Sequence, residues 1–148
     1  MVNQIDSSIF ITGQKKSGKT FLAHMMATYF INNLHISSSK INIIIQDPNT
    51  NPFWSLALPN ANIFDCTQNI ANIQSSIMES YENIPSESNH QNNSLLILDD
   101  CINSSNDNIL SDILNNNQFN ATQSNKQIIV TCENANVFNT NTLSMFNK

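Results

Sequence analysis

Eight consecutive residues near the start of the chain have the types and the spacing needed to bind phosphate groups. Two glycines would let the backbone approach an anion closely, and the amide N–H groups of such a loop attract negative charge. A lysine places a positive charge on the terminal phosphates, and the hydroxyl that follows it can ligate Mg²⁺. This pattern, G-x-x-x-x-G-K-[ST], is met in full by Gly13, Gln14, Lys15, Lys16, Ser17, Gly18, Lys19 and Thr20.

The surroundings of these eight residues favour a phosphate-binding loop (P-loop) over a plain turn before a helix. Both glycines of the chain lie in the motif. An apolar run precedes it and a segment with helical periodicity follows it, as a P-loop requires. The motif therefore predicts that residues 13–20 bind a nucleotide, with Lys19 as a catalytic residue and Thr20 as a ligand of Mg²⁺. For Lys15 and Lys16, exposure in the loop is the simpler interpretation.

Two carboxylates follow an apolar run later in the chain. Residues 95–98 are Leu-Leu-Ile-Leu, and Asp99 and Asp100 come directly after them. A buried strand that ends in Asp suits a carboxylate that holds Mg²⁺, so Asp99 is predicted to be a metal ligand. Asp100 stands where many P-loop ATPases carry the acid that orients the attacking water. Because Asp is also common in turns after strands, both interpretations of Asp100 stay open.

Polar residues also end the last apolar run, at residues 127–131. Thr131 and Glu133 lie there, and a polar side chain at this point could sense the terminal phosphate. Glu133 is accordingly predicted to be catalytic, with a solvated strand end as the alternative. Phe53 and Trp54 are expected near the same edge of the fold, where covering the sheet is favoured over stacking on a base.

The elements that must position these residues alternate between strand and helix. Strands are expected at residues 8–12, 41–45, 61–64, 95–98 and 127–131, the first of them buried. Helices are expected after the P-loop, from Ile70 to Tyr81 and from Ile109 to Leu114. The first helix is expected to carry an apolar face at helical spacing, formed by Phe21, Leu22, Met25, Met26, Tyr29 and Phe30.

Near-continuous apolar strands alternating with helices predict a single α/β domain over residues 1–148. Its parallel sheet would be covered by helices on both faces, which gives three layers. Ligands bind beyond the carboxyl ends of the strands in such sheets. We therefore expect Thr12, Gln46, Asp99 and Thr131 to lie at the binding edge.

Charge and composition exclude several classes of protein. The net charge is −5, and the chain has six lysines and no arginine, so it cannot build the large basic face typical of nucleic-acid binders. Nucleotide kinases clamp phosphate with arginines, and GTPase switches need a further glycine in D-x-x-G. The three cysteines form no C-x-x-C pair that would indicate zinc. With neither a signal peptide nor a membrane-spanning stretch in sight, we expect a cytoplasmic protein.

The order of these motifs resembles the viral DNA-packaging ATPases of the poxvirus type, within the FtsK/HerA superfamily. The resemblance covers the P-loop, the proline-bearing loop at residues 47–52, the strand that ends in Asp99 and Asp100, and the strand at 128–133, where Glu133 replaces a Gln. It implies a P-loop NTPase of the ASCE type, in which the last strand lies between the other two motif strands. ATP and Mg²⁺ are the implied ligands.

The same resemblance implies a motor that packages double-stranded DNA during virion assembly, in the host cytoplasm or in association with the virion. The acidic composition opposes direct DNA binding, so DNA would be reached through an oligomer or a partner. A partner could also supply the missing arginine. Two alternatives remain, namely a nucleotide-dependent switch that binds a protein partner with little hydrolysis, and a fragment of a larger motor.

Overall fold

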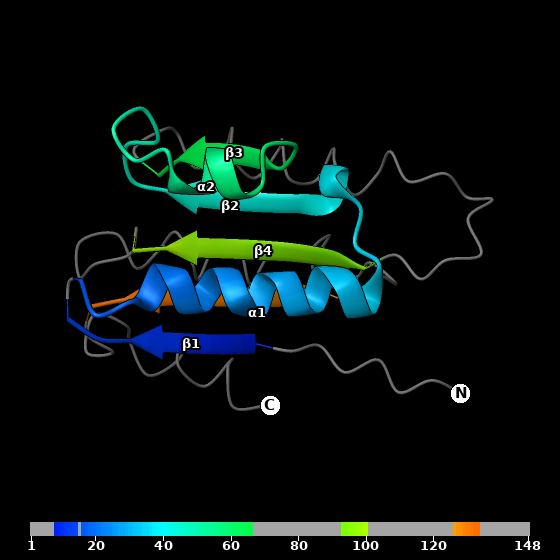
Figure 1. Ribbon diagram of the computed structural model, residues 1–148, viewed down its shortest axis with the longest axis horizontal. Helices are drawn as coiled ribbons and strands as arrows, with labels where there is room; N and C mark the ends of the chain where they lie inside the picture. The colour runs from blue at the N-terminus through cyan, green and yellow to red at the C-terminus, as the bar shows by residue number, and fades with distance from the viewer. Residues whose placement is uncertain (1–7, 15, 67–92, 101–125, 134–148) are drawn as a thin grey trace.

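Five strands form one parallel sheet in the order β1-β5-β4-β2-β3 (Figure 1). The computed structural model describes residues 8–14, 16–66, 93–100 and 126–133. The strands are β1 (Ser8–Thr12), β2 (Ile41–Ile45), β3 (Asn62–Asp65), β4 (Ser94–Asp99) and β5 (Lys126–Cys132). The helices are α1 (Lys19–Leu34), α2 (Phe53–Ala57) and the 3₁₀ turn η1 (Ser38–Lys40). The helices predicted near residues 70–81 and 109–114 lie outside the described residues.

The strand register brings the predicted polar residues to one edge. Asp99 is paired with Thr131 on one side and with Ile45 on the other. Thr12 is paired with Cys132, the residue that follows Thr131 in β5. All five strands end at this edge because they are parallel, so the predicted positions of the strand ends are confirmed. The position of β5 between β1 and β4, which the resemblance implied, is confirmed as well.

The three central strands are buried on both faces. β-Branched and leucine side chains fill β2, β4 and β5, as expected for strands covered on two sides. Their largest fully buried side chains are Ile43, Ile44, Ile45, Leu95, Leu96, Ile97, Leu98 and Ile129. β1 differs from the prediction, because Ile9, Phe10 and Ile11 are only half-buried. Among the strands that the structure describes, β1 lies at the edge of the sheet and has β5 as its one neighbour, which explains the lower burial.

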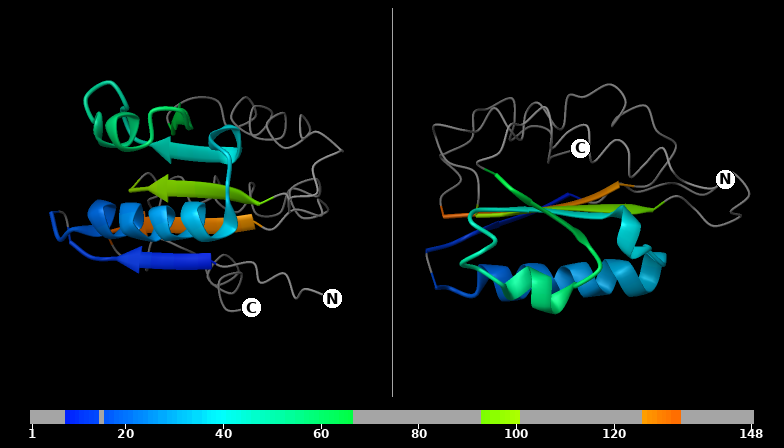
Figure 2. Two further views of the ribbon diagram at one scale, coloured as in Figure 1. Left: turned by 45° about the vertical axis from the view of Figure 1, so that its right-hand side comes forward. Right: turned by 90° about the horizontal axis from the view of Figure 1, so that it is seen from above.

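Helices α1 and α2 cover the same face of the sheet (Figure 2). The hydrophobic core on this face joins Ala23 and Ala27 of α1 and Trp54 of α2 to the inward residues of the strands. Helix α2 was not predicted from the sequence. It begins after Pro52, and the loop before it turns at Asp47, whose carbonyl accepts hydrogen bonds from the amides of Thr50 and Asn51. None of the helices in the described part of the chain is long and apolar enough to cross a membrane.

Only part of the apolar face expected on α1 packs on the sheet, namely Phe30 and the partly buried Met26. The residues of this helix that are buried are Lys19, Ala23, Ala27 and Phe30, whereas the bulky residues Phe21, Leu22, Met25 and Tyr29 are exposed. The small side chains of Ala23 and Ala27 let the helix lie close to the sheet at these two positions. The helical spacing of the apolar residues therefore identified the helix, but not which of its residues are buried.

One substitution on each face of α1 tests this orientation of the helix. Ala27 is fully buried and Met25 is 53% exposed. We expect Ala27→Leu to lower the free energy of unfolding by about 1–3 kcal/mol through overpacking, and Met25→Ala to change it by less than about 0.5 kcal/mol. Urea unfolding followed by circular dichroism measures both values. A larger loss for Met25→Ala than for Ala27→Leu would contradict the orientation.

Candidate functional site

The loop between β1 and α1 favours glycine at its two motif positions, at Gly18 by its backbone conformation and at Gly13 by the close approach of a side chain. Gly18 has a φ of +93°, in the left-handed region that disfavours residues with a Cβ. Gly13 has little space around it, because a Cβ there would lie 2.7 Å from the Ser17 hydroxyl oxygen. Lys16 also has a positive φ, of 63°. The loop is thus tightly turned, as the motif predicts, and Lys15 lies outside the described residues.

Lys19 lies in the first turn of α1, on the side of the helix that faces the sheet. Its side chain is 8% exposed. The ammonium donates hydrogen bonds to the carbonyl oxygens of Gly13 at 2.6 Å and Gln14 at 3.0 Å. These bonds satisfy the buried cation and hold its amine against the inner side of the loop.

The Asp99 carboxylate is the most heavily bonded side chain of the site. It is 4% exposed. The Thr20 hydroxyl donates to it, lying 3.2 Å from Oδ1 and 3.0 Å from Oδ2. The Thr131 hydroxyl donates to Oδ1 at 2.5 Å, and the Trp54 indole N–H donates to Oδ2 at 2.7 Å. Donors from α1, α2 and β5 therefore converge on a single acid at the end of β4.

Asp100 turns away from this buried network toward solvent. Its φ is +53°, a left-handed conformation that Asp tolerates better than most residues. Its amide donates to the Thr131 carbonyl at 3.0 Å and to the Thr131 hydroxyl at 2.9 Å. Thr131 thereby holds both acidic residues, one through its hydroxyl proton and the other as an acceptor.

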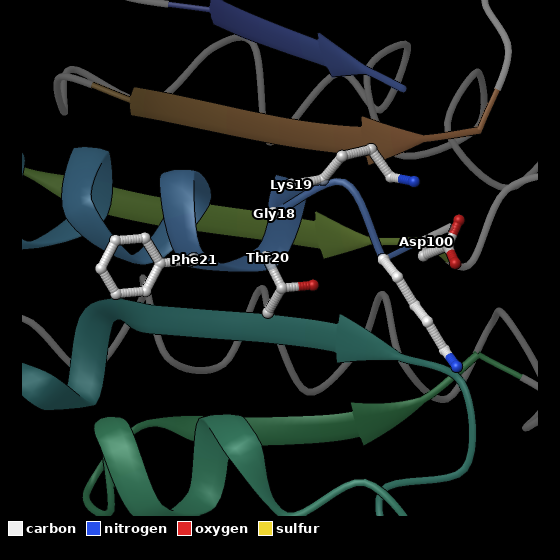
Figure 3. A pocket seen from close by; sticks show the side chains of 6 residues that line it. Gly18, Lys19, Thr20, Phe21 and Asp100 are labelled. Atoms are coloured by element: carbon white, nitrogen blue, oxygen red, sulfur yellow. The ribbon is translucent and has the colours of Figure 1, made fainter. Parts of the chain in front are cut away.

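An open pocket of about 380 Å³ lies between the P-loop and this acidic turn. Its lining residues are Lys16, Gly18, Lys19, Thr20, Phe21 and Asp100. Figure 3 shows Lys19 and Thr20 pointing toward the end of the sheet where Asp100 follows β4, while Phe21 points the other way. The volume falls within the range of small-molecule sites. The pocket therefore combines two cations, a hydroxyl and a carboxylate from separate parts of the sequence.

Two other residues singled out from the sequence are placed differently. Thr131 is fully buried and bonded to the acidic turn, so its hydroxyl faces Asp99 instead of the pocket. Glu133 follows β5 and is exposed, but it is not one of the residues that line the pocket. Its catalytic role stays a prediction.

Sequence reasoning missed the role of Trp54. The expectation that it covers the sheet is confirmed, since its side chain is 0% exposed. The hydrogen bond to Asp99, 45 positions away, was not foreseen. The N–H of a buried tryptophan usually donates a hydrogen bond, so the sequence could have indicated that Trp54 has an acceptor. Only the fold identifies the acceptor.

The oxygen atoms at the site suit Mg²⁺. Mg²⁺ is usually held by one or two carboxylates together with substrate phosphates and waters, and not by a cage of protein ligands. Asp99 and Thr20 offer such oxygens side by side. No group of three or more His, Cys, Asp or Glu side chains that could hold a metal ion occurs in residues 8–14, 16–66, 93–100 and 126–133.

No model of a known protein family matches this sequence, and no curated protein matches it either.

Proposed function

We propose that this protein binds Mg-ATP through residues 13–20 and hydrolyses it slowly, as a P-loop ATPase of the ASCE type. One observation carries the proposal. The Thr20 hydroxyl bonds to the Asp99 carboxylate at 3.0 Å, although the two residues lie 79 positions apart. These are the two residues that the sequence independently assigns to Mg²⁺. A plain turn before a helix does not require a hydrogen bond between the first turn of the helix and a carboxylate at the end of a distant strand.

Each residue of the loop has a definable part in binding. The backbone amides and the positive end of α1 would attract the phosphates. Lys19 would exchange the carbonyl oxygens of Gly13 and Gln14 for phosphate oxygens. Thr20 and Asp99 would hold Mg²⁺, whose chemistry is to neutralise the charge that builds up on the phosphates during transfer. Gly18 allows the left-handed backbone conformation, with φ of +93°, from which α1 begins.

Asp100 is the residue proposed to orient the attacking water. Its carboxylate lines the pocket together with Lys19 and Thr20, and its backbone is held by Thr131. Turnover is expected to be slow because the chain has no arginine. An arginine finger raises the rate of related enzymes by about 10³- to 10⁵-fold, and here it would have to come from a partner protein.

The strand order supports the ASCE part of the proposal. β5 lies between the strand that leads into the P-loop and the strand that ends in Asp99. This arrangement is the one implied by the resemblance to viral genome-packaging motors, and packaging of double-stranded DNA is the process we propose on that basis. A net charge of −5 argues that DNA contact requires an oligomer or a partner.

A second candidate is a nucleotide-dependent switch that binds a protein partner and hydrolyses little. The lack of arginine favours it, since binding does not need an arginine finger but rapid turnover does. Both candidates require the same Mg-ATP site and differ in the rate of hydrolysis and in its response to DNA.

Single-turnover ATP hydrolysis by the full chain tests the proposal. We expect ATP binding and slow hydrolysis in Mg²⁺, both weakened in EDTA, and Asp100→Asn to keep the binding while hydrolysis falls about 100-fold. Asn also tolerates the left-handed conformation at this position, so the backbone is preserved. Hydrolysis that increases with double-stranded DNA supports the motor, and tight binding with negligible turnover supports the switch. A chain that binds no ATP in either condition refutes both.

A further inference from the structure

We propose that Trp54 is a positioning residue for the Mg²⁺ site, because its indole N–H fixes the orientation of the Asp99 carboxylate. The inference rests on the proposed function and adds to it a residue outside the phosphate-binding and acidic motifs. The bond is short, at 2.7 Å, and both side chains are buried, with exposures of 0% and 4%. A hydrogen bond from a neutral donor to a buried carboxylate is stronger than one at the surface.

Two of the three donors on Asp99 hold opposite oxygens. Thr131 bonds to Oδ1 and Trp54 bonds to Oδ2. Hydrogen bonds at both oxygens restrict rotation of the carboxylate about its Cβ–Cγ bond. The orientation of its plane is therefore set by Thr131 of β5 and Trp54 of α2.

The third donor has a different geometry. The Thr20 hydroxyl is shared between the two oxygens, at 3.2 and 3.0 Å. If this hydroxyl turns toward Mg²⁺, the bonds from Thr131 and Trp54 still hold Asp99 in place. Trp54 would therefore keep the carboxylate ready for the metal at the moment when Thr20 leaves it.

The position of the indole is itself fixed by aromatic packing. Its ring lies edge-on to Phe53, with ring centroids 5.2 Å apart, and to His24 of α1, at 6.0 Å. His24 also meets Phe53 edge-on at 5.7 Å. This cluster joins α2 to the helix that follows the P-loop, so the N–H cannot move away from Asp99 without disturbing three rings.

The Mg²⁺ dependence of ATP affinity tests the role of Trp54. Calorimetric titration with ATP, in EDTA and in Mg²⁺, gives the gain in affinity due to the metal. We expect Trp54→Phe, which keeps an aromatic ring and removes the N–H, to reduce that gain by about 10- to 100-fold. Affinity in EDTA should stay at the parental value, because the P-loop is untouched. A purely structural role would lower both affinities together.

Phe53→Leu is the matched control. It alters the same helix and the same ring cluster but removes no donor from Asp99, so the gain due to Mg²⁺ should stay parental. Equal losses in the two variants would assign the effect to packing and overturn the proposal.

A second substitution keeps the test valid if Trp54→Phe does not fold. Trp54 is the single tryptophan of the chain, so replacing tryptophan with benzothienylalanine changes this residue alone and exchanges its N–H for sulfur at nearly constant shape. A reduced gain from Mg²⁺ is expected again. A parental gain in a folded protein that binds ATP overturns the role of Trp54 alone, whereas no ATP binding by the parent protein overturns the proposed function as well.

Discussion

Replacing Lys19 with alanine is expected to weaken ATP binding by about 10- to 100-fold, which corresponds to the loss of a hydrogen bond between charged groups. Hydrolysis should fall by about 100-fold or more, because a cation aimed at the developing charge contributes most in the transition state. The structure gives the reason for so large an effect. The Lys19 ammonium is already held at the inner side of the loop by Gly13 and Gln14, so it needs little reorganisation to meet a phosphate.

Lys40→Ala is the matched control for the loss of one positive charge. Lys40 lies in η1, just before β2 begins, and therefore at the opposite edge of the sheet from the pocket. Calorimetric titration with ATP and single-turnover hydrolysis should give parental values for this variant. Equal losses in the two variants would mean that net charge, and not the P-loop, governs binding.

Lys19→Ala also removes the donor that satisfies two loop carbonyls, so unfolding in urea should be measured for the same samples. A variant that is folded at the assay temperature and binds ATP as the parent does would exclude the P-loop as the nucleotide site. The binding proposal would then fail, whatever the geometry of the loop.

Asp99→Asn is expected to have the second large effect, on both stability and catalysis. An amide keeps one acceptor oxygen. If that oxygen faces Trp54, the NH₂ group faces the Thr131 hydroxyl, which then loses its acceptor. One buried donor is left unsatisfied in every orientation, which should lower the free energy of unfolding by about 1–3 kcal/mol. Losing the carboxylate that we propose as the Mg²⁺ ligand should slow hydrolysis by about 100-fold.

Asp65→Asn separates these effects from a simple loss of negative charge. Asp65 ends β3 and pairs with Ile45, which in turn pairs with Asp99, so it lies in the same layer of the sheet, two strands away. It should keep parental Mg²⁺-dependent hydrolysis. Urea unfolding followed by the fluorescence of the single tryptophan measures stability, and hydrolysis across a range of Mg²⁺ concentrations measures the site. Unchanged Mg²⁺ dependence in Asp99→Asn would exclude Asp99 as the metal ligand.

Much of the sheet could be predicted from local sequence. The β-branched runs at residues 41–45 and 127–131 and the leucine-rich run at 95–98 are strands. Central strands of a parallel sheet are buried on both faces and therefore read as nearly continuous apolar runs. Thr12, Asp99 and Thr131 lie at one edge for a related reason, since parallel strands all end on the same side.

The orientation of α1 could not be predicted in the same way. A period of 3.6 residues identifies the helix, but two stripes of this sequence satisfy that period. Four of the large residues, Phe21, Leu22, Met25 and Tyr29, are exposed, and the stripe containing Ala23, Ala27 and Phe30 faces the sheet. Packing of the helix on the sheet decides which of the two stripes is buried, and this packing is a tertiary property.

The sequence by itself therefore determined the motif, its expected chemistry and the class of fold, because these depend on residue types at short, definite spacings. Only the tertiary structure decided which groups meet at Asp99. Its donors come from Thr20, Trp54 and Thr131, which lie on three elements that are distant along the chain. No local pattern encodes such a meeting, since it follows from the strand order, the register and the packing of α1 and α2 on one face of the sheet.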